Sequence, residues 1–346
     1  MLDQFFNWYN GLTDHLWGSL MLFAVGVILL IKGGDWFVDS AVGIAKRFHV
    51  PEIIIGATVV SIGTTLPEVM VSVTAALNGN GAIAYGNAIG SIICNTSLIA
   101  ALTIAIRPAP AERKTLVTPV VFFFASAAIY MVAAYFFGRF DRWLGIVMLT
   151  VFAIYMIMTV RNGFKNPVKV ETEEEEEDED KGGSLIKDIL VLVISAALIA
   201  VGADMLEGSS VSLATMAGIP TEVVGVTVVA LCTSLPELVT AVTALAKGHG
   251  ALSLGNIIGA NIFNLVLVSG AAVTLSPFQI PAGSTLFGLN TSQVVEIPLM
   301  VGVMALMTLP TLAKGKLRRW QGITLLCIYG AFVTLQVLIA TGALPK

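Results

Sequence analysis

Residues 61–68 read Ser-Ile-Gly-Thr-Thr-Leu-Pro-Glu, and residues 230–237 read Ala-Leu-Cys-Thr-Ser-Leu-Pro-Glu. These octapeptides are the centre of a longer repeat, because residues 33–95 align without a gap on residues 202–264 at a constant shift of 169. The two copies are identical at 26 of 63 positions, and the matches include Gly, Pro, Asn and acidic residues that compositional bias does not produce. The chain is therefore predicted to consist of two related halves.

The composition places both halves in a membrane. Hydrophobic residues make up 56% of the 346 residues and charged residues only 12%, against roughly 25% charged residues in an average soluble protein. Nine of the 23 acidic residues lie in one stretch, 171–180, so most of the chain is nearly free of charge. These values exclude a soluble enzyme and favour a polytopic membrane protein.

Ten apolar stretches are long enough to cross a bilayer. They lie at 17–45, 51–77, 81–106, 115–137, 141–160, 186–212, 220–246, 250–275, 293–312 and 318–341. We predict an all-α polytopic membrane protein whose ten transmembrane helices form two five-helix repeats. The expected parts are an N-terminal interfacial segment (1–16), a first repeat (17–160), an acidic loop (161–185) and a second repeat (186–341).

The distribution of basic residues predicts the orientation. If both termini lie outside, 15 of the 19 Lys and Arg residues and the acidic loop fall on the cytoplasmic side, as the positive-inside rule requires. Equivalent helices of the two repeats are five spans apart, so the repeats have opposite orientations. Inverted repeats are typical of secondary transporters, which bind their substrate near the midplane where the repeats meet.

Each repeat carries one acidic residue deep within an apolar span, Glu68 and Glu237. An ionised carboxylate at this depth costs about 2.5–3.5 kcal/mol on insertion scales and is retained where it pairs with a cation or lines a wet cavity. The one Lys in a predicted span of the repeat, Lys32, has Asp35 one helical turn away as a possible partner. The two glutamates are therefore expected to lack a basic partner.

The residues around the glutamates supply oxygen atoms. Pro67 and Pro236 remove a backbone donor from each helix, which frees carbonyl groups one turn earlier. Hydroxyl groups on the same turns come from Thr64, Thr65, Thr233 and Ser234. A site made of carboxylates, carbonyls and hydroxyls suits a hard cation such as calcium, and two negative charges neutralise one divalent ion.

The third and eighth spans repeat a second pattern, at 86–95 and 255–264. Glycines four residues apart, such as Gly86 with Gly90 and Gly255 with Gly259, permit close packing of helices. Neutral oxygens are available on Ser91, Asn95, Asn261 and Asn264. Asn87 and Asn256 follow glycines, and bracing of the backbone is as good an interpretation for them as ion binding.

The sequence lacks the motifs of common enzyme active sites. The three histidines lie at predicted span ends or outside, the three cysteines are isolated, and no HExxH, GxSxG or Walker motif occurs. We expect no cofactor, no nucleic acid and no obligate protein partner, so the expected partners are the lipid bilayer and the transported ions.

The motifs at 63–68, 232–237, 86–95 and 255–264 resemble the two alpha-repeats of the sodium/calcium exchanger family, within the cation/calcium antiporter superfamily. The resemblance implies antiport of calcium against sodium, with the first and sixth helices sliding across the others to alternate access. It implies that both ions share Glu68 and Glu237, and that Thr64 and Thr233 give calcium-binding carbonyls. The implied sodium ligands are the carbonyls of Ser61 and Ala230 together with Thr65, Ser91, Ser234, Glu68 and Glu237, around a pocket lined by Asn95 and Asn264. The implied structural or gating residues are Pro67, Pro236, Gly63, Asn87, Asn256, Gly90 and Gly259.

The sequence also departs from the family pattern. Cys232 replaces a glycine and Ala260 a serine, which weakens one outer sodium site, and Asn264 stands where potassium-dependent relatives carry an aspartate. A calcium/proton antiporter is the alternative interpretation, because glutamates can carry protons, and a passive cation channel is a third. The compact chain without a large central domain indicates the inner membrane of a prokaryotic cell.

Overall fold

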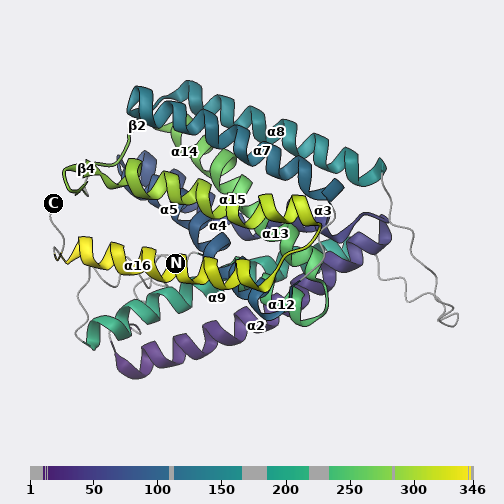
Figure 1. Cartoon of the computed structure of the whole chain (residues 1–346). Helices are drawn as coiled ribbons and strands as arrows, with labels where there is room; N and C mark the ends of the chain where they lie inside the picture. The colour runs from purple at the N-terminus through teal and green to yellow at the C-terminus, as the bar shows by residue number, and fades with distance from the viewer. Residues whose placement is uncertain are drawn as a thin grey trace, which may run out of the picture.

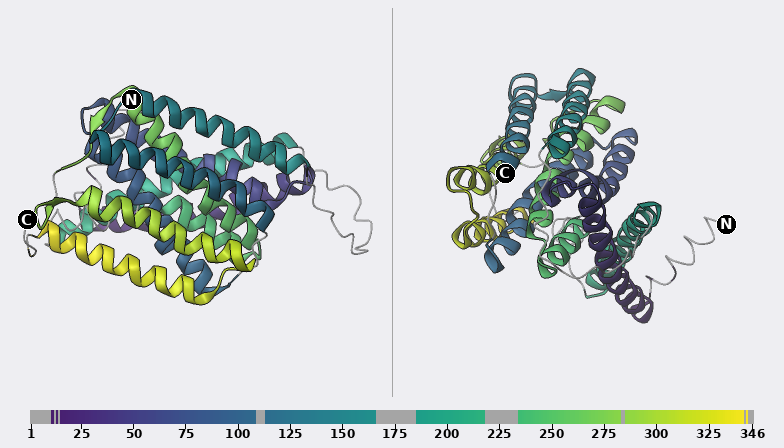
Figure 2. Two further views of the ribbon diagram at one scale, coloured as in Figure 1. Left: turned by 45° about the horizontal axis from the view of Figure 1, so that its top comes forward. Right: turned by 90° about the vertical axis from the view of Figure 1, so that its right-hand side faces the viewer.

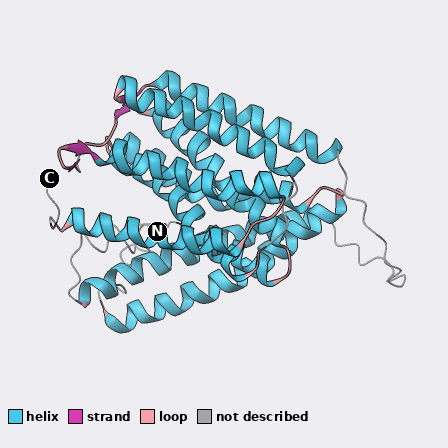
Figure 3. Cartoon of the chain, viewed as in Figure 1, coloured by secondary structure: helices cyan, strands magenta, loops and turns pink. Residues whose placement is uncertain are grey.

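The computed structural model describes residues 11, 13, 15–108, 113–165, 185–217, 234–282, 285–341 and 343. Nearly all of these residues are helical, and the long helices form one bundle (Figure 1, Figure 3). Large apolar side chains such as Trp17, Ile157 and Ile194 remain exposed on its outer faces. Such faces are stable next to lipid, because helices satisfy their own backbone hydrogen bonds there.

The elements follow the predicted repeats. The first half contains α2 (Leu16–Arg47), α3 (Glu52–Ile55), α4 (Ser61–Leu77), α5 (Gly81–Cys94), α6 (Ala101–Ile106), α7 (Arg113–Val132) and α8 (Arg142–Lys165). The second half contains α9 (Leu185–Met216), α12 (Leu235–Ala246), α13 (Gly250–Phe263), α14 (Ser269–Leu275), α15 (Ile297–Lys314) and α16 (Arg319–Ala340). Wider π-helical segments occur within the spans as η1 (Gly56–Val60), η2 (Asn95–Ala100), η3 (Ala133–Phe137), η5 (Asn264–Val268) and η6 (Ser292–Glu296).

The prediction of an all-α membrane protein is confirmed. In the described part of the chain, nine helical stretches are long and apolar enough to cross a membrane. The second span is continuous from Glu52 to Leu77, although it contains Pro67. The seventh predicted span is seen only as α12, because residues 218–233 lie outside the described ranges. The acidic stretch 171–180 also lies outside them, so the proposed boundaries of the loop remain predictions.

The packing of α2 against α9 shows the inversion of the repeats directly. Each is the first helix of its repeat, and they lie side by side along one side of the bundle (Figure 1, Figure 2). Ser19 bonds Ser212 over 3.2 Å near one end, and an ion pair of 3.4 Å joins Arg47 to Asp188 near the other. Since low numbers of one helix meet high numbers of the other, the two run antiparallel.

Two glycines allow this pair of helices to touch. A methyl group on Gly26 would lie 2.9 Å from the carbonyl oxygen of Gly202, and one on Gly202 would lie 2.9 Å from that of Gly26. Small residues at a crossing let helix backbones approach closely in a membrane, where packing drives association. The two long helices therefore form one packed unit.

The remaining helices form the principal core. Buried residues from the third, fourth, fifth, eighth and ninth spans meet there, including Phe123, Tyr130, Phe263 and Met304. A smaller buried cluster, which includes Phe37 and Ile199, joins α2 and α9 to the second span and to α12. The second span is thus held between the α2–α9 pair and the principal core.

Four short strands lie together at one end of the bundle (Figure 3). β1 (Arg139–Phe140) pairs antiparallel with β2 (Phe278–Gln279), and β3 (Thr285–Leu286) pairs antiparallel with β4 (Leu289–Asn290). The β1–β2 pair links the two repeats at this end, which we call the strand end. The opposite end carries Arg107, Lys247 and Arg318, and we call it the basic end.

Candidate ion-binding site

The fold brings the two predicted glutamates together at the centre of the bundle. The side chain of Glu68 on α4 is 1% exposed and that of Glu237 on α12 is 0% exposed. The two carboxyl groups are close enough for their charges to interact. The Thr65 hydroxyl lies 3.5 Å from Oε1 of Glu237, so it links the two repeats. Residues 169 positions apart thus share one buried site.

Neither glutamate has a basic partner within the described ranges. The ion pairs there involve other carboxylates, namely those of Asp188, Asp141, Asp35, Asp39 and Glu52. Two like charges buried side by side repel each other, and burial also costs each its hydration. Within the described ranges no basic side chain offsets these charges, so a bound cation or a proton would stabilise the pair.

The pairing predicted for Asp35 is wrong. The side chain of Lys247 lies 3.5 Å from Asp35 and 2.8 Å from Asp39, and it also donates to the backbone carbonyl of Asp35. Lys32 lies on the same helix but is exposed. The helix presents Asp35 to the turn after α12 rather than to Lys32. The expectation that followed, of glutamates without a basic partner, holds in the described ranges.

A group of buried oxygen atoms around the glutamates has no hydrogen-bond partner among the described residues. Buried polar atoms are almost always paired in proteins, so such a group needs an explanation. It comprises both carboxylate oxygens of Glu68, Oε2 of Glu237, the hydroxyls of Ser91 and Ser234 and the amides of Asn95 and Asn264. All belong to residues that the sequence predicts as ligands. Unpaired carboxylate, hydroxyl and amide oxygens are the donor set that hard cations take.

The described residues contain no cluster of three or more His, Cys, Asp or Glu side chains that could hold a metal ion. The site therefore has two carboxylates, and neutral oxygens make up the remainder. A low charge and many neutral ligands suit ions that must enter and leave, because binding is not dominated by fixed negative charge.

The hydroxyls of Ser61 and Thr64 are used within the protein. That of Ser61 donates to the carbonyl of Gly56 over 2.8 Å and to that of Asn256 over 3.0 Å. That of Thr64 lies 3.4 Å from Oδ1 of Asn256, whose Nδ2 donates to Thr240 over 2.8 Å. The two hydroxyls thus contact Asn256 of the other repeat, and the carbonyl roles that the resemblance implies for Ser61 and Thr64 remain predictions.

The paired asparagines Asn87 and Asn256 connect neighbouring helices. The Nδ2 atom of Asn87 donates to the backbone carbonyl of Glu68 over 3.2 Å and to the Ser72 hydroxyl over 2.8 Å. In the other repeat Asn256 contacts Ser61, Thr64 and Thr240 as described above. These bonds favour the interpretation that both asparagines brace the backbone beside the glutamates.

Gly259 lies where α13 crosses the second span. A methyl group there would lie 2.3 Å from the Ser61 hydroxyl and 2.7 Å from the Cα atom of Ala57. Gly90 is its counterpart in the repeat, and no described residue lies within 4 Å of a methyl group placed on it. The repeat counterparts of Ala57 and Ser61 are Val226 and Ala230, which are outside the described ranges.

Of the other predicted residues, some lie in the described ranges and others lie outside them. Gly63 faces α2, where a methyl group would lie 3.0 Å from the Phe37 ring. Pro67 lies inside α4, and Pro236 lies in the first turn of α12, one residue before Glu237. Ala230, Cys232 and Thr233 lie outside the described ranges. Ala260 and Asn261 are both buried, and Asn261 donates to Thr96 over 2.7 Å.

Some features of the site could not be predicted. Asn95 and Asn264 each begin a π-helical segment, η2 and η5. Such single wide turns often mark functional sites, but no residue pattern in the sequence specifies them. Thr240, which accepts from Asn256, also escaped prediction, because its repeat counterpart is Val71.

Comparison with known proteins shows the family of the chain. A family model described as sodium/calcium exchanger protein matches residues 18–161 and 187–338. The chain is 31% identical to sodium/calcium exchanger MaX1 of Methanosarcina acetivorans over 348 aligned positions, covering 91% of this chain and 97% of that protein. It is 33% identical to the uncharacterized membrane protein MJ0091 of Methanocaldococcus jannaschii, covering 89% and 94%.

The fold agrees with a solved exchanger. The structure of the sodium-calcium exchanger NCX_Mj, soaked with sodium and strontium ions, aligns with a TM-score of 0.76 at 30% identity. The alignment covers 91% of this chain and 98% of that chain. Together with the family match, these similarities show that the chain is a multi-pass membrane protein that belongs to the sodium/calcium exchanger family.

Proposed function

We propose that this protein exchanges calcium for sodium across the membrane, and that Glu68 and Glu237 bind both ions in turn. One observation carries the proposal. Two buried carboxylates without a basic partner in the described ranges are surrounded by oxygen atoms that lack hydrogen bonds. The names of MaX1 and NCX_Mj, both sodium/calcium exchangers, support the identity of the two ions.

Charge explains why the two ions would compete. Two ionised glutamates carry a charge of −2, which one calcium ion neutralises and which also attracts sodium ions. Calcium takes six to eight oxygen ligands, so it would draw the carbonyls of Thr64 and Thr233 into its shell besides the carboxylates. Sodium ions would take the flanking oxygens of Ser61, Thr65, Ser91, Ala230 and Ser234. When both ions require the same glutamates, they cannot bind together, and exchange follows.

The arrangement of helices suggests how access alternates. The α2–α9 pair packs along one side of the second span, beside the glutamates, and its two helices are closely packed on each other. We infer that this pair moves as a unit and opens the site to each side in turn. The inverted repeats would relate the two open states by a pseudo-two-fold axis in the membrane plane.

The distribution of charge supports an orientation. The basic end carries most of the Lys and Arg residues, so we place it in the cytoplasm. The strand end and both termini would then lie outside the cytoplasm. The membrane would be the inner membrane of a prokaryotic cell.

Ion flux into proteoliposomes tests the proposal. Calcium uptake is measured with an imposed sodium gradient, and separately with an imposed proton gradient at equal sodium. We expect uptake to follow the sodium gradient and to be insensitive to the proton gradient. Uptake driven only by protons would show a calcium/proton antiporter instead, and uptake without any gradient of a second ion would show a channel.

A further inference from the structure

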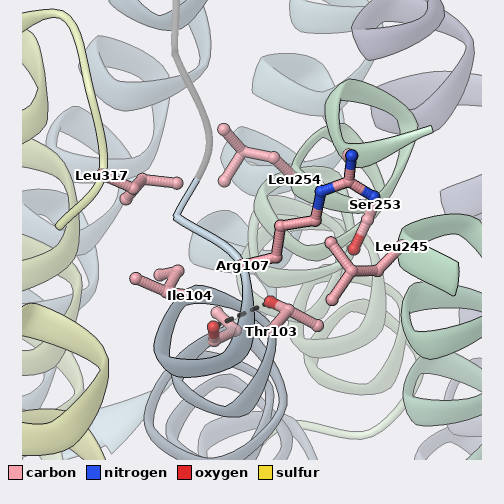
Figure 4. Close-up of a pocket in the computed structure, with 9 residues that line it drawn as sticks. Thr103, Ile104, Arg107, Leu245, Ser253, Leu254 and Leu317 are labelled. Carbon is pink, nitrogen blue, oxygen red and sulfur yellow. Dashed lines mark hydrogen bonds between the residues drawn. The ribbon is translucent and has the colours of Figure 1, made fainter. Parts of the chain in front are cut away.

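A small pocket lies at the basic end of the bundle, outside the glutamate site (Figure 4). It opens where α6 and α12 end and α13 begins. None of its lining residues belongs to the predicted ion ligands, and none is acidic. They are Ala100, Thr103, Ile104, Arg107, Leu245, Gly250, Ser253, Leu254 and Leu317.

The N-terminus of α13 forms one wall of this pocket. The first N–H groups of a helix have no acceptor within it, and the helix dipole places positive charge there. His249 precedes the helix, but its side chain makes no hydrogen bond to it. Its ring lies instead 2.8 Å from the carboxylate of Glu52. The amide groups at this helix end are thus left without a side-chain cap.

A buried hydroxyl in the first turn of α13 is an independent sign of a ligand. Ser253 lines the pocket and is 3% exposed, and its Oγ atom has no hydrogen-bond partner in the part of the chain that the structure describes. A buried hydroxyl without a partner is costly, so a polar group entering the pocket would stabilise it.

Arg107 supplies full positive charge on the opposite wall. Its side chain lines the same pocket as Ser253 (Figure 4), and it forms no ion pair with the described residues. Arg319 donates to the carbonyl of Ile106, next to Arg107, over 3.3 Å. Arg318 follows the pocket residue Leu317, and its buried Nε atom also lacks a partner. Arg107 is thus the cation that lines the pocket, and Arg318 and Arg319 follow its lining residue Leu317 along the chain.

At the equivalent place in the other repeat, a side chain caps the helix N-terminus and an aromatic ring fills the space. There the Asn80 side chain caps α5 by accepting from the N–H of Ile83. Ala84 takes the place of Ser253, and Ser276 that of Arg107. The Phe278 ring fills the space and packs on Ala76, Ala84 and Ala272. Of these two equivalent places in the described chain, Phe278 occupies the one at the strand end, and the pocket lies at the one at the basic end.

We propose that this pocket binds the phosphate oxyanion of an anionic membrane phospholipid. A helix N-terminus with an arginine and a hydroxyl is a ready site for phosphate. The remaining lining is apolar, through Ile104, Leu245, Leu254 and Leu317, as suits a group attached to a lipid. Basic pockets between transmembrane helices near the cytoplasmic face bind such headgroups. Free phosphate has the same chemistry, so the experiment includes it.

Native mass spectrometry of the full-length protein in detergent tests this site. The three probes are phosphatidylglycerol, phosphatidylcholine and inorganic phosphate. We expect the wild-type protein to retain phosphatidylglycerol at least several-fold more tightly than phosphatidylcholine. Two variants copy the other repeat. Arg107→Ser should weaken phosphatidylglycerol binding about tenfold or more, and Ser253→Ala about two- to tenfold.

Lys316→Ser is the matched control, since Lys316 is an exposed cation at the same end that does not line the pocket. It should leave binding within about twofold. Thermal unfolding without added lipid checks that each variant is folded, and Ser253→Ala is the variant least able to disturb the fold. Unchanged phosphatidylglycerol binding by both folded variants would overturn the site. Retention of inorganic phosphate without any preference for phosphatidylglycerol would overturn its assignment to a lipid.

Discussion

The two repeats share their centre and differ at their ends. At the centre Glu68 and Glu237 are equally buried, and Asn95 and Asn264 both have unpartnered amides. At the ends, Asn80 and Phe278 close the helix start in one repeat, whereas His249 and an open pocket occupy it in the other. Under the proposed exchange the central residues would serve the same ions from both sides, which explains why they recur in both repeats. The ends face different leaflets and have no such constraint.

The same comparison applies to the contacts that hold the α2–α9 pair. At the basic end, Lys247 joins the turn after α12 to Asp35 and Asp39. The residues of the first repeat that correspond to Lys247 and His249 are Asn78 and Asn80, which carry no charge. Ionic contacts thus join the α2–α9 pair to the turn after α12 at the basic end. The predictions below test the symmetric centre first and the asymmetric ends last.

The largest effect is expected from removing either central charge. Glu68→Gln and Glu237→Gln each leave one carboxylate for a divalent ion, and breaking a buried charge pairing costs about 3–5 kcal/mol. At about 1.4 kcal/mol per factor of ten, each variant should lose at least a hundredfold in calcium transport. Sodium-driven calcium uptake in proteoliposomes measures this loss.

Glu52→Gln is the control, because Glu52 lies at the start of the second span and contacts His249 rather than the site. It should retain transport within a few-fold. If one central variant were inactive and the other active, the two repeats would not share the ion as proposed.

The next largest effect is expected from a substitution that disturbs the packing of α13 on the second span. Gly259→Ala places a methyl group against Ser61 and the backbone of Ala57, and overpacking of this kind costs about 1–3 kcal/mol. We expect a lower thermal unfolding midpoint and weaker ion binding, because Ser61 must move.

Gly302→Ala is a matched control on α15, since no described atom lies within 4 Å of a methyl group placed there. Its unfolding midpoint should equal or exceed that of the wild type, because alanine favours helix over glycine. Equal midpoints for the two alanine variants would show that α13 and the second span are less closely packed than described.

The two central asparagines should contribute equally to calcium affinity. Asn95→Ala and Asn264→Ala each remove one neutral oxygen from the pocket, which is worth about 1 kcal/mol for a typical polar contact. Calcium affinity, measured by isothermal titration, should fall about fivefold in each variant.

Asn78→Ala, in the exposed turn after α4, should leave the affinity unchanged. A loss confined to one of the two central variants would show that the ion lies nearer one repeat than the other.

The smallest effect concerns the ionic contact at the basic end. Lys247→Gln removes the ion pairs with Asp35 and Asp39 of α2. The Lys247 side chain is 28% exposed and those of its partners 40% and 65%, so the expected loss of stability is at most about 1 kcal/mol. Thermal unfolding at low and high salt measures it, and the difference from wild type should disappear near 1 M salt, where screening is strong.

Lys32→Gln, on an exposed part of α2, should leave the unfolding midpoint unchanged at either salt concentration. A salt-independent loss for Lys247→Gln would show that its contribution is packing by the aliphatic stem rather than charge.

Much of the site could be predicted because its residues recur. The shift of 169 pairs Glu68 with Glu237 and Asn95 with Asn264. Polar residues inside membrane spans are rare and usually functional, so their position in apolar spans indicates a binding site. The partner of Asp35 could not be predicted, because Lys247 is 212 residues away and nothing local favours it over Lys32. The roles of the Ser61 and Thr64 hydroxyls were equally hidden, since they depend on Asn256 from the other repeat.

The sequence by itself determined the membrane class, the two repeats, their inversion and the identity of the central acids. These follow from hydropathy, from the count of spans and from residues that recur at a fixed shift, all of which are properties of the linear chain. The tertiary structure alone decided which oxygens are left unpaired, how closely Gly26 meets Gly202, and which end keeps an open pocket. These depend on contacts between helices that are far apart in the chain, where packing rather than local pattern selects the partner.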